Sequence, residues 1–442
     1  MTNVRDFGAE GDGRTDDTDA IQRALDEGDG LIWLDRGDYV ISRPLVVELA
    51  EAGRLGINGG GGTATLVMTG PGPALDLVGT HGGTAGPDSF KPGVWKLERM
   101  PTVSQLEIVG AHDEADGIRL TMTHAAIISQ VHIRECRHGV HLVKRDRNAI
   151  ITDCHIYSNR GIGVFYDGVN IHQSNITGSH ISYNKAGGIK ILDAQIRNIQ
   201  IAGNDIEYNY DLEAEESADV WFECVGDTIR EGAITGNTIQ ASPSPGGANV
   251  RIRGARMEHP TAAGLLTIAG NLISSQGTNV HIADSRGIVV AGNQFFSGHE
   301  HTMLIERSEY INLSGNNIGH NPDYKADTID GIVLSDCNGC SLTGTIIEST
   351  RAGSEQQGGA IDVRRSTAIN IVGCQVHDPL HRAFYLEDVQ GSRVSDCILA
   401  QSERDNTMQE AVRLEDECDA VQMADNLFEP GRNGTVVGAG AI

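Results

Sequence analysis

Short runs in which apolar and polar residues alternate fill most of the chain. Between Gly187 and Ile239, two such runs, Ile189 to Leu192 and Ile199 to Ile206, are separated by a few turn-forming residues, and the pattern returns at Val220. Alternation with a period of two is typical of short strands with one buried face, and no helical period competes with it here. The pattern predicts a chain made almost entirely of short β-strands.

The same two-strand unit recurs at a step of roughly 22 to 33 residues, which is typical of stacked repeats. Its second strand ends at Gly203-Asn204, Gly236-Asn237, Gly270-Asn271, Gly292-Asn293 and Gly315-Asn316, and at the related pairs Asp153-Cys154, Gly373-Cys374, Asp396-Cys397 and Asp425-Asn426. One turn cannot bury its own apolar face, so the turns must stack. We predict an all-β, single-stranded, right-handed parallel β-helix, with the handedness usual for parallel crossovers.

An asparagine at one fixed turn position can form a ladder in which each amide bonds to the next. Cysteine is small enough to occupy the same position. The eight cysteines are therefore expected to be buried thiols. Cys337 and Cys340 are interpreted in the same way, rather than as a metal or redox pair.

The amino-terminal residues predict a helix. Asp16 or Asp17 can cap it, and Ala20, Ile21, Ala24 and Leu25 form its apolar stripe. Such a helix would close the open end of the column. We divide the chain into residues 1–50 (cap and first turns), 51–100 (glycine-rich insertion and early turns), 101–430 (parallel β-helix) and 431–442 (carboxy-terminal tail).

Composition agrees with a solenoid. There are 55 glycines among 442 residues and aromatic residues make up 5%, which suits many tight turns around a narrow aliphatic interior. The net charge of −26 argues against nucleic acid as a partner and gives no support for binding to an anionic membrane. No apolar run approaches the roughly 18 residues that span a bilayer. The first residues lack an apolar signal region, so we expect a cytoplasmic protein or a secreted one without its leader.

The amino-terminal run resembles a known signature. Its residues Asp6-Phe7-Gly8-Ala9, Gly11-Asp12-Gly13, Thr15-Asp16-Asp17-Thr18 and Ala20-Ile21-Gln22 are similar to the start of the pectate-lyase-like, or pectin-lyase-fold, superfamily. The resemblance implies a right-handed β-helix that acts on polysaccharides. It does not imply one chemistry, because the superfamily includes hydrolases, lyases, transferases, epimerases and phage tailspikes.

The period of two also separates inward from outward side chains. Val220 and Phe222 are predicted to point inward, and Trp221 and Glu223 outward. Because equivalent residues of stacked turns lie about 4.8 Å apart, the outward residues form one surface. Its members are Lys190, Trp221, Glu223, Arg251, Arg253 and His281, and Asp193 lines the same side. An exposed Trp can stack on a sugar ring, and Arg can bind a carboxylate or sulfate.

An acidic insertion from Glu207 to Asp219 leads directly into the Trp221 strand, so its carboxylates are expected to overhang this surface. Cleavage of a glycosidic bond needs an acid carboxyl and a base or nucleophile carboxylate. We assign these roles to Glu223 and Asp219, with Trp221 and Asp193 among the substrate-binding residues. The favoured function is a glycoside hydrolase or an intramolecular glycosyltransferase that requires no cofactor and no metal.

β-Elimination of a uronate is the alternative. It needs Arg or Ca²⁺ to neutralise the substrate carboxylate and a base from Lys190, an Arg or His281. Arg251 and Arg253 favour this chemistry, whereas the acidic insertion favours hydrolysis or supplies Ca²⁺ ligands.

A third interpretation is a non-catalytic carbohydrate-binding or tailspike-like module.

The run Cys337-Asn-Gly-Cys-Ser-Leu-Thr and the Gly-Asn pairs also resemble inulin fructotransferases, which are trimeric β-helix enzymes. That resemblance implies a homotrimer, which light scattering would refute by giving the mass of a monomer.

Overall fold

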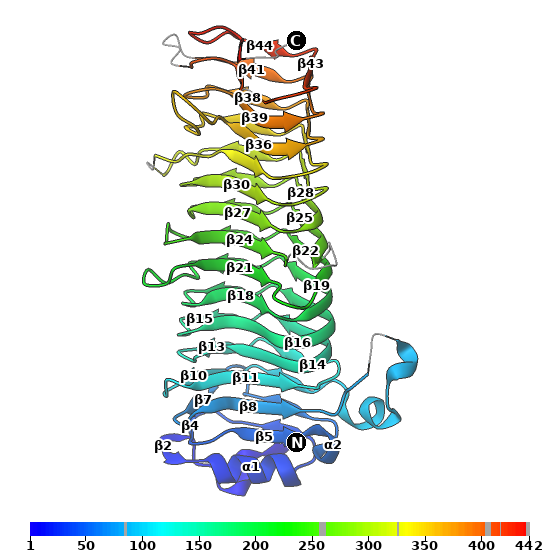
Figure 1. The fold of residues 1–442 in the computed structure, drawn as a ribbon. Helices are drawn as coiled ribbons and strands as arrows, with labels where there is room; N and C mark the ends of the chain where they lie inside the picture. Colours follow the sequence, from blue (N-terminus) through cyan, green and yellow to red (C-terminus); the bar gives the residue numbers. More distant parts are fainter. Residues whose placement is uncertain (84–85, 256–261, 325–326, 403–407, 416, 439–442) are drawn as a thin grey trace. The chain divides into compact units, whose positions relative to one another are not determined.

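The computed structural model describes residues 1–442 except 84–85, 256–261, 325–326, 403–407, 416 and 439–442. It divides into two compact parts, Met1–Ala233 and Ile234–Ile442. Within each part the chain coils so that strands of successive turns pair in parallel (Figure 1). Each regular turn contributes to three sheets, so the all-β parallel β-helix prediction is confirmed.

In the first part, a first sheet is formed by β5 (Leu45–Glu48), β8 (Gly72–Val78), β11 (Ala115–Thr121), the start of β14 (Val140–Thr152), the start of β16 (Ile162–Thr177), β18 (Gly187–Leu192) and β21 (Ser217–Glu223). A second sheet is formed by β1 (Thr2–Asn3), β3 (Leu31–Trp33), β6 (Gly56–Asn58), β9 (Thr102–Ser104), β12 (Ile127–Ser129), the ends of β14 and β16, β19 (Gln195–Ala202) and β22 (Ile229–Thr235). The third sheet contains β2 (Asp12–Asp16), β4 (Gly37–Ile41), β7 (Ala64–Met68), β10 (Glu107–Gly110), β13 (His132–Arg134), β15 (His155–Tyr157), β17 (His180–Ser182) and β20 (Asp205–Glu207).

In the second part, the first sheet contains β24 (Gly247–Arg253), β27 (Thr278–Ala283), β30 (His301–Glu306), β33 (Ile332–Ser335), β36 (Ile361–Thr367), β39 (Phe384–Gln390), β42 (Val412–Leu414) and β45 (Val436–Gly438). The second sheet contains β25 (Ala263–Ala269), β28 (Arg286–Ala291), β31 (Asn312–Ser314), β34 (Ser341–Thr343), β37 (Asn370–Val372), β40 (Arg393–Ser395) and β43 (Gln422–Ala424). The third contains β23 (Thr238–Gln240), β26 (Leu272–Ser274), β29 (Gln294–Phe296), β32 (Asn317–Gly319), β35 (Ile346–Glu348), β38 (Gln375–His377), β41 (Ile398–Ala400) and β44 (Leu427–Phe428).

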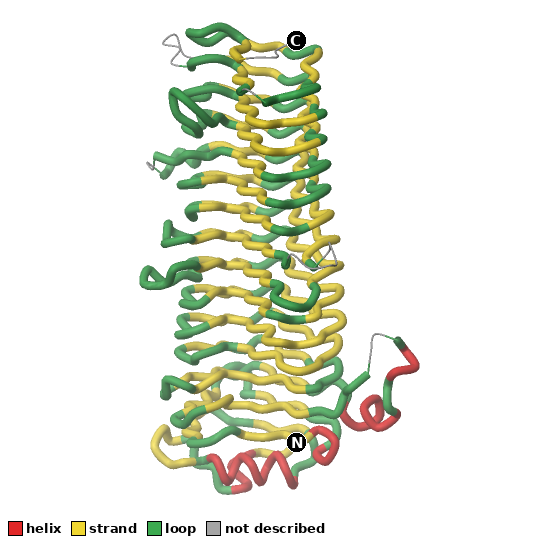
Figure 2. Tube along the Cα trace, in the orientation of Figure 1, coloured by secondary structure: helices red, strands yellow, loops and turns green. Residues whose placement is uncertain are grey.

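Helical segments are few among the described residues (Figure 2). They are η1 (Val4–Phe7), α1 (Thr18–Glu27), α2 (Leu49–Ala52), η2 (Pro87–Ser89) and the π-helical η3 (Val94–Glu98). The predicted apolar stripe of α1 is buried, as expected. Asp16 Oδ1 accepts from the Thr18 backbone N–H at 3.1 Å, whereas the Asp17 carboxylate accepts from the backbone of Glu10 and Gly11. That α1 closes the column stays a prediction.

The turn before each ladder position explains the recurring glycines. Gly203, Gly236 and Gly270 have φ values of 66°, 64° and 64°, in the left-handed region where glycine carries no steric cost. Asp153 and Asp396 adopt φ values of 55° and 57° at the equivalent places, as aspartate tolerates better than most residues.

The predicted asparagine ladder is confirmed. In the second part, Asn237 donates to Asn271, Asn271 to Asn293 and Asn293 to Asn316, at 2.9, 2.9 and 3.0 Å. The first part holds a further ladder in which Asn159 donates to Asn184 and Asn184 to Asn209, each at 2.8 Å. All of these side chains are buried. Seven of the eight cysteines are buried and Cys418 is half-buried, and all are free thiols.

Replacing Asn184 by alanine is expected to destabilise the first part strongly. Asn184 is fully buried, accepts from Asn159, and donates to Asn209 and to the Ile156 carbonyl. Each buried polar group left without a partner costs about 1–3 kcal/mol, so the total should reach about 3–5 kcal/mol. Calorimetry should show a thermal midpoint lowered by several degrees. The exposed Asn312→Ala change is the control, and equal shifts in both variants would contradict the role of the ladder.

Among the described residues, no helix is both long and apolar enough to cross a membrane.

Candidate functional site

Lys190, Trp221 and Glu223 lie together on the outer side of the first sheet in the first part. The pairing of β18 with β21 sets Lys190 beside Trp221. The Lys190 ammonium nitrogen lies 3.5 Å from the centre of the Trp221 ring, and Trp221 Nε1 donates to Glu223 Oε2 at 2.8 Å. Val220 and Phe222, which alternate with Trp221 and Glu223 along β21, are 0% and 1% exposed. The predicted register and the inward and outward directions are therefore confirmed.

The prediction that Trp221 is an exposed platform is wrong. Trp221 is only 8% exposed, because Lys190 covers its ring and Glu223 holds its indole nitrogen. Phe165, which pairs with Lys190 on the other side, is also 8% exposed. A sugar that stacks on the covered face of Trp221 must displace the Lys190 head group, which its long flexible stem allows.

The prediction that Asp219 overhangs this surface is also wrong. Asp219 is 1% exposed, and its Oδ1 accepts from the backbone and side-chain nitrogens of Asn209, each at 3.0 Å. It therefore continues the interior ladder of Asn159, Asn184 and Asn209. Since β21 begins at Ser217, Asp219 belongs to the strand and not to the insertion. A carboxylate in this position is not open to a polysaccharide.

Arg251, Arg253 and His281 belong to the second part. β24 pairs with β27 so that Arg251 lies beside His281. Arg251 Nε donates to His281 Nδ1 at 3.5 Å, and His281 Nε2 lies 3.0 Å from Glu306 Oε2. Burial is the main cause that lowers the pKa of His281. Arg253 is half-buried and pairs with Ala283.

The expectation that Arg251 is open to solvent is wrong. It is 3% exposed although Val250 and Ile252 beside it point inward. Its guanidinium donates to the carbonyl of Gly246, in the loop directly before β24, and to His281. This loop and the neighbouring strand therefore cover Arg251.

The side chain of Asp193 stabilises a turn of the backbone. It has a φ of 46°, and its Oδ1 accepts from the Gly226 N–H at 3.0 Å, so it fixes the turn after β18.

Two residues that the sequence pattern did not assign to the site, Asp167 and Phe165, lie on the same outer side as Lys190. His141 Nε2 is 3.1 Å from Asp167 Oδ2, and the His141 ring stacks on Phe165 with centroids 5.2 Å apart and planes at 8°. We define the β14–β21 face as His141, Phe165, Asp167, Lys190, Trp221 and Glu223. Aligning Gly161-Ile-Gly-Val-Phe-Tyr-Asp with the Trp221 strand would have placed Asp167 in the same row as Glu223.

The β14–β21 face carries two carboxylates at a defined spacing. Asp167 pairs with Leu192, and Leu192 pairs with Glu223. Two strand steps of about 4.8 Å separate the two backbones by about 10 Å. Asp167 and Glu223 are only half-buried, so both remain open to a ligand.

The described residues contain no group of three or more His, Cys, Asp and Glu side chains arranged to hold a metal ion. The Ca²⁺ dependence expected for a lyase therefore stays a prediction.

Three family models match different segments of the chain. Residues 1–58 match the model described as rhamnogalacturonase A/epimerase, pectate lyase-like; residues 92–206 match the right handed beta helix region; and residues 226–396 match the periplasmic copper-binding protein NosD. A curated relative, alginate lyase 7 of Azotobacter vinelandii, is 57% identical over 44 residues. That stretch is 9% of this chain and 5% of the relative.

Solved structures share the fold at low sequence identity. A tailspike protein of the E. coli bacteriophage HK620, in complex with a pentasaccharide, is 11% identical, with a TM-score of 0.56 and coverage of 96% of this chain and 80% of that one. The Agl-KA catalytic domain is 10% identical, with a TM-score of 0.50 and coverage of 96% and 68%. The coil of parallel strands and the match of residues 92–206 agree on a right-handed parallel β-helix, and residues 1–58 are similar to the pectate-lyase-like family.

Proposed function

We propose that this protein hydrolyses a glycosidic bond of a poly- or oligosaccharide on the β14–β21 face, with Asp167 and Glu223 as the acid and base pair. The observation that carries the proposal is the placement of these two carboxylates in one outward row, two strand steps apart. Lys190 and Trp221 lie in the adjacent row and would contact a sugar that is bound between Asp167 and Glu223. The match of residues 1–58 to a model named for a rhamnogalacturonase supports a carbohydrate ligand.

The spacing favours one of the two glycosidase mechanisms. Carboxyl groups about 6.5–9.5 Å apart leave room for a water molecule and invert the anomeric carbon, whereas groups about 5–5.5 Å apart form a covalent intermediate. A backbone separation of about 10 Å favours the first. One carboxyl group protonates the departing glycosidic oxygen as its C–O bond breaks. The other takes a proton from the water that forms the new C–O bond.

Product stereochemistry follows from this spacing. The first product is expected to carry the inverted anomeric configuration, read by proton NMR within minutes of mixing, before mutarotation. Retention of configuration would contradict the assignment of Asp167 and Glu223 as the pair.

The activity can be tested before the sugar is identified. The wild type is incubated with alginate, polygalacturonate, inulin and dextran, and reducing ends and the ultraviolet absorbance of unsaturated uronates are measured together. The proposal predicts new reducing ends without that absorbance for at least one polysaccharide. Silence in both measurements would contradict it and leave a binding module or a transferase that makes cyclic products.

β-Elimination is the second candidate, and Lys190 is the observation that favours it. In its neutral amine form, the Lys190 side chain on the outer face of β18, beside an aromatic ring, is a candidate base that would take the C5 proton of a uronate. Unsaturated products from alginate or polygalacturonate, lost in Lys190→Met, would establish this chemistry in place of hydrolysis.

A further inference from the structure

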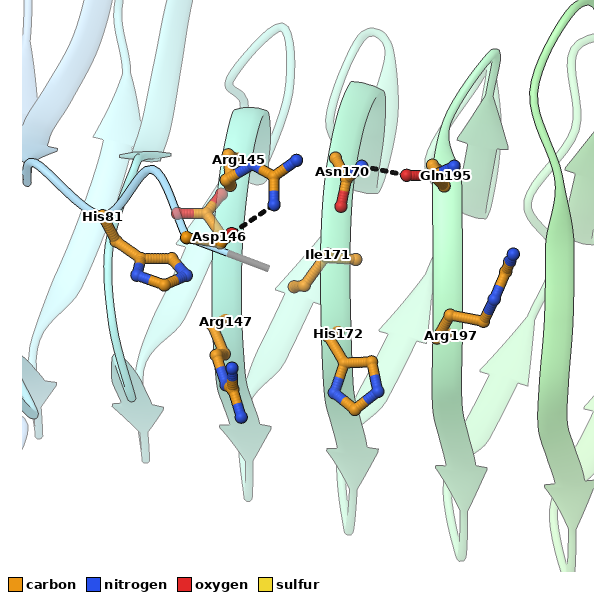
Figure 3. Close-up of a pocket in the computed structure, with 10 residues that line it drawn as sticks. His81, Arg145, Asp146, Arg147, Asn170, Ile171, His172, Gln195 and Arg197 are labelled. Carbon is orange, nitrogen blue, oxygen red and sulfur yellow. Dashed lines mark hydrogen bonds between the residues drawn. The ribbon is translucent and has the colours of Figure 1, made fainter. Parts of the chain in front are cut away.

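A hollow lies on the second sheet of the first part, beside the segment that joins β8 to β9 (Figure 3). It encloses about 170 Å³. A cavity of about 150 Å³ accommodates a benzene ring, so this hollow has room for a six-membered ring. Its floor is built by β14, β16 and β19, whose pairing aligns Arg147, His172 and Arg197 in one row. Figure 3 shows these three side chains on neighbouring strands.

The charge of this hollow is opposite to that of the whole chain. Arg145, Arg147 and Arg197 line it, and among the described residues of the lining only Asp146 carries a carboxyl group. The chain as a whole has a net charge of −26. Burial lowers the pKa of Arg147, and burial together with the Arg230 cation lowers the pKa of Arg197. Burial disfavours the charged form of both guanidinium groups, and a bound anion would offset this cost.

The two histidines of the hollow, His81 and His172, are uncharged near pH 7. Burial lowers the pKa of His81 to about 4, with further lowering from His124 and Arg147. Burial and the Arg147 cation lower the pKa of His172. Both rings are therefore neutral near pH 7, and each can donate one hydrogen bond.

Two buried polar atoms of the lining have no hydrogen-bond partner in the part of the chain that the structure describes. They are Asp146 Oδ2 and His172 Nδ1. Asp146 is 1% exposed, and only its Oδ1 is engaged, by the N–H and hydroxyl of Thr123 at 2.7 Å each. A buried polar atom without a partner costs free energy unless a ligand or water satisfies it.

We infer that this hollow is a binding site for a small oxyanion, either a carboxylate carried on a pyranose ring or a sulfate, held by Arg147, His172 and Arg197. Guanidinium groups bind such oxygens through two parallel N–H bonds, and an acceptor-only ligand suits a lining rich in donors. The site is on the second sheet, apart from the β14–β21 face, and it does not depend on the proposed cleavage.

The segment beside the hollow offers an extension for a longer ligand. Arg147 lies over the Phe90 ring at 4.3 Å, and Phe90 contacts Trp95 with centroids 6.4 Å apart. Trp95 is 59% exposed, so its indole is open for stacking on a sugar next to the bound anionic group.

Calorimetric titration with galacturonate, galactose and sodium sulfate tests the inference. Galacturonate is expected to bind and to be displaced by sulfate, and galactose is not expected to bind. Arg197→Gln should raise the galacturonate Kd at least tenfold, and Arg160→Gln, outside the lining, should leave it unchanged. His172→Gln, which keeps a side-chain donor, should have a smaller effect than His172→Leu.

Several results would overturn the inference. These are no galacturonate binding at millimolar concentration, equal binding of galactose, or an unchanged Kd in both Arg197→Gln and Arg147→Gln. Circular dichroism of each variant separates loss of the site from loss of the fold. Because galacturonate is not cleaved, the result is independent of whether the protein hydrolyses any polysaccharide.

Discussion

Replacing Glu223 by glutamine is expected to reduce saccharide cleavage by about a thousandfold. General acid–base catalysis contributes about 10²–10⁴ in rate, and glutamine cannot exchange a proton at this position. The amide keeps the size of the side chain and can still accept from Trp221 Nε1, so the β14–β21 face should keep its shape. Initial rates of reducing-end formation on the polysaccharide that the wild type cleaves measure the effect.

Two companion variants make the result specific. Asp167→Asn should lose a similar factor, because both carboxyl groups act on one bond. Glu215→Gln changes an exposed glutamate of the nearby insertion and should retain the wild-type rate. Wild-type turnover in Glu223→Gln, or equal loss in Glu215→Gln, would remove Glu223 from the mechanism.

Asp146→Asn is expected to change how stability depends on pH. Burial raises the pKa of Asp146 from 3.8 to about 7, against the lowering effect of the Thr123 hydrogen bonds. Between these values the folded protein holds one proton more than the unfolded chain, so this group makes folding less stable as pH rises. At 1.36 kcal/mol per unit, the loss between pH 4 and pH 7 reaches about 4 kcal/mol.

The variant removes this contribution because asparagine does not titrate. The thermal midpoint of the wild type should therefore fall relative to Asp146→Asn between pH 4 and pH 7. Other groups, such as His138, whose pKa burial lowers to about 4, titrate in both proteins and cancel in the difference. Asp153→Asn, at an exposed turn, is the control and should run parallel to the wild type. Parallel curves for Asp146→Asn would show that its carboxyl group is not perturbed.

Local sequence pattern was sufficient for the fold and for side-chain direction. The inward direction of Val220 and Phe222 and the outward direction of Trp221 and Glu223 follow from a period of two. The ladder positions follow from the Gly-Asn pairs, because a residue in the left-handed conformation must precede each ladder position. The ladder contacts of Asn237, Asn271 and Asn293 follow the same periodicity.

The pattern failed where a hydrogen bond from a loop or from a neighbouring strand buries a charged side chain. Arg251 is buried by the Gly246 carbonyl and by His281, 30 residues later, and neither contact is visible in the alternation. Asp219 was assigned to the insertion, although the structure uses it as the next member of a ladder that begins at Asn159. Both amide and carboxylate oxygens accept hydrogen bonds, so the ladder signal is not limited to asparagine.

The hollow lined by Arg147, His172 and Arg197 could not be predicted from the sequence for a different reason. β14 and β16 each continue through the bend between two sheets as one long strand, so the alternation does not mark their second halves as separate elements. A signal was present, because Arg147, His172 and Arg197 recur at a constant step in the sequence. The contact of Arg145 with the Gly83 carbonyl joins segments 62 residues apart, and no local pattern predicts it.

A crystal structure of the Glu223→Gln protein soaked with an oligosaccharide of the cleaved polymer is the decisive measurement for the β14–β21 face. We predict a sugar ring on this face, with its glycosidic oxygen between Asp167 and the residue at position 223 and with Lys190 displaced from the Trp221 ring. An oligosaccharide bound elsewhere, with this face empty, would contradict the proposed site.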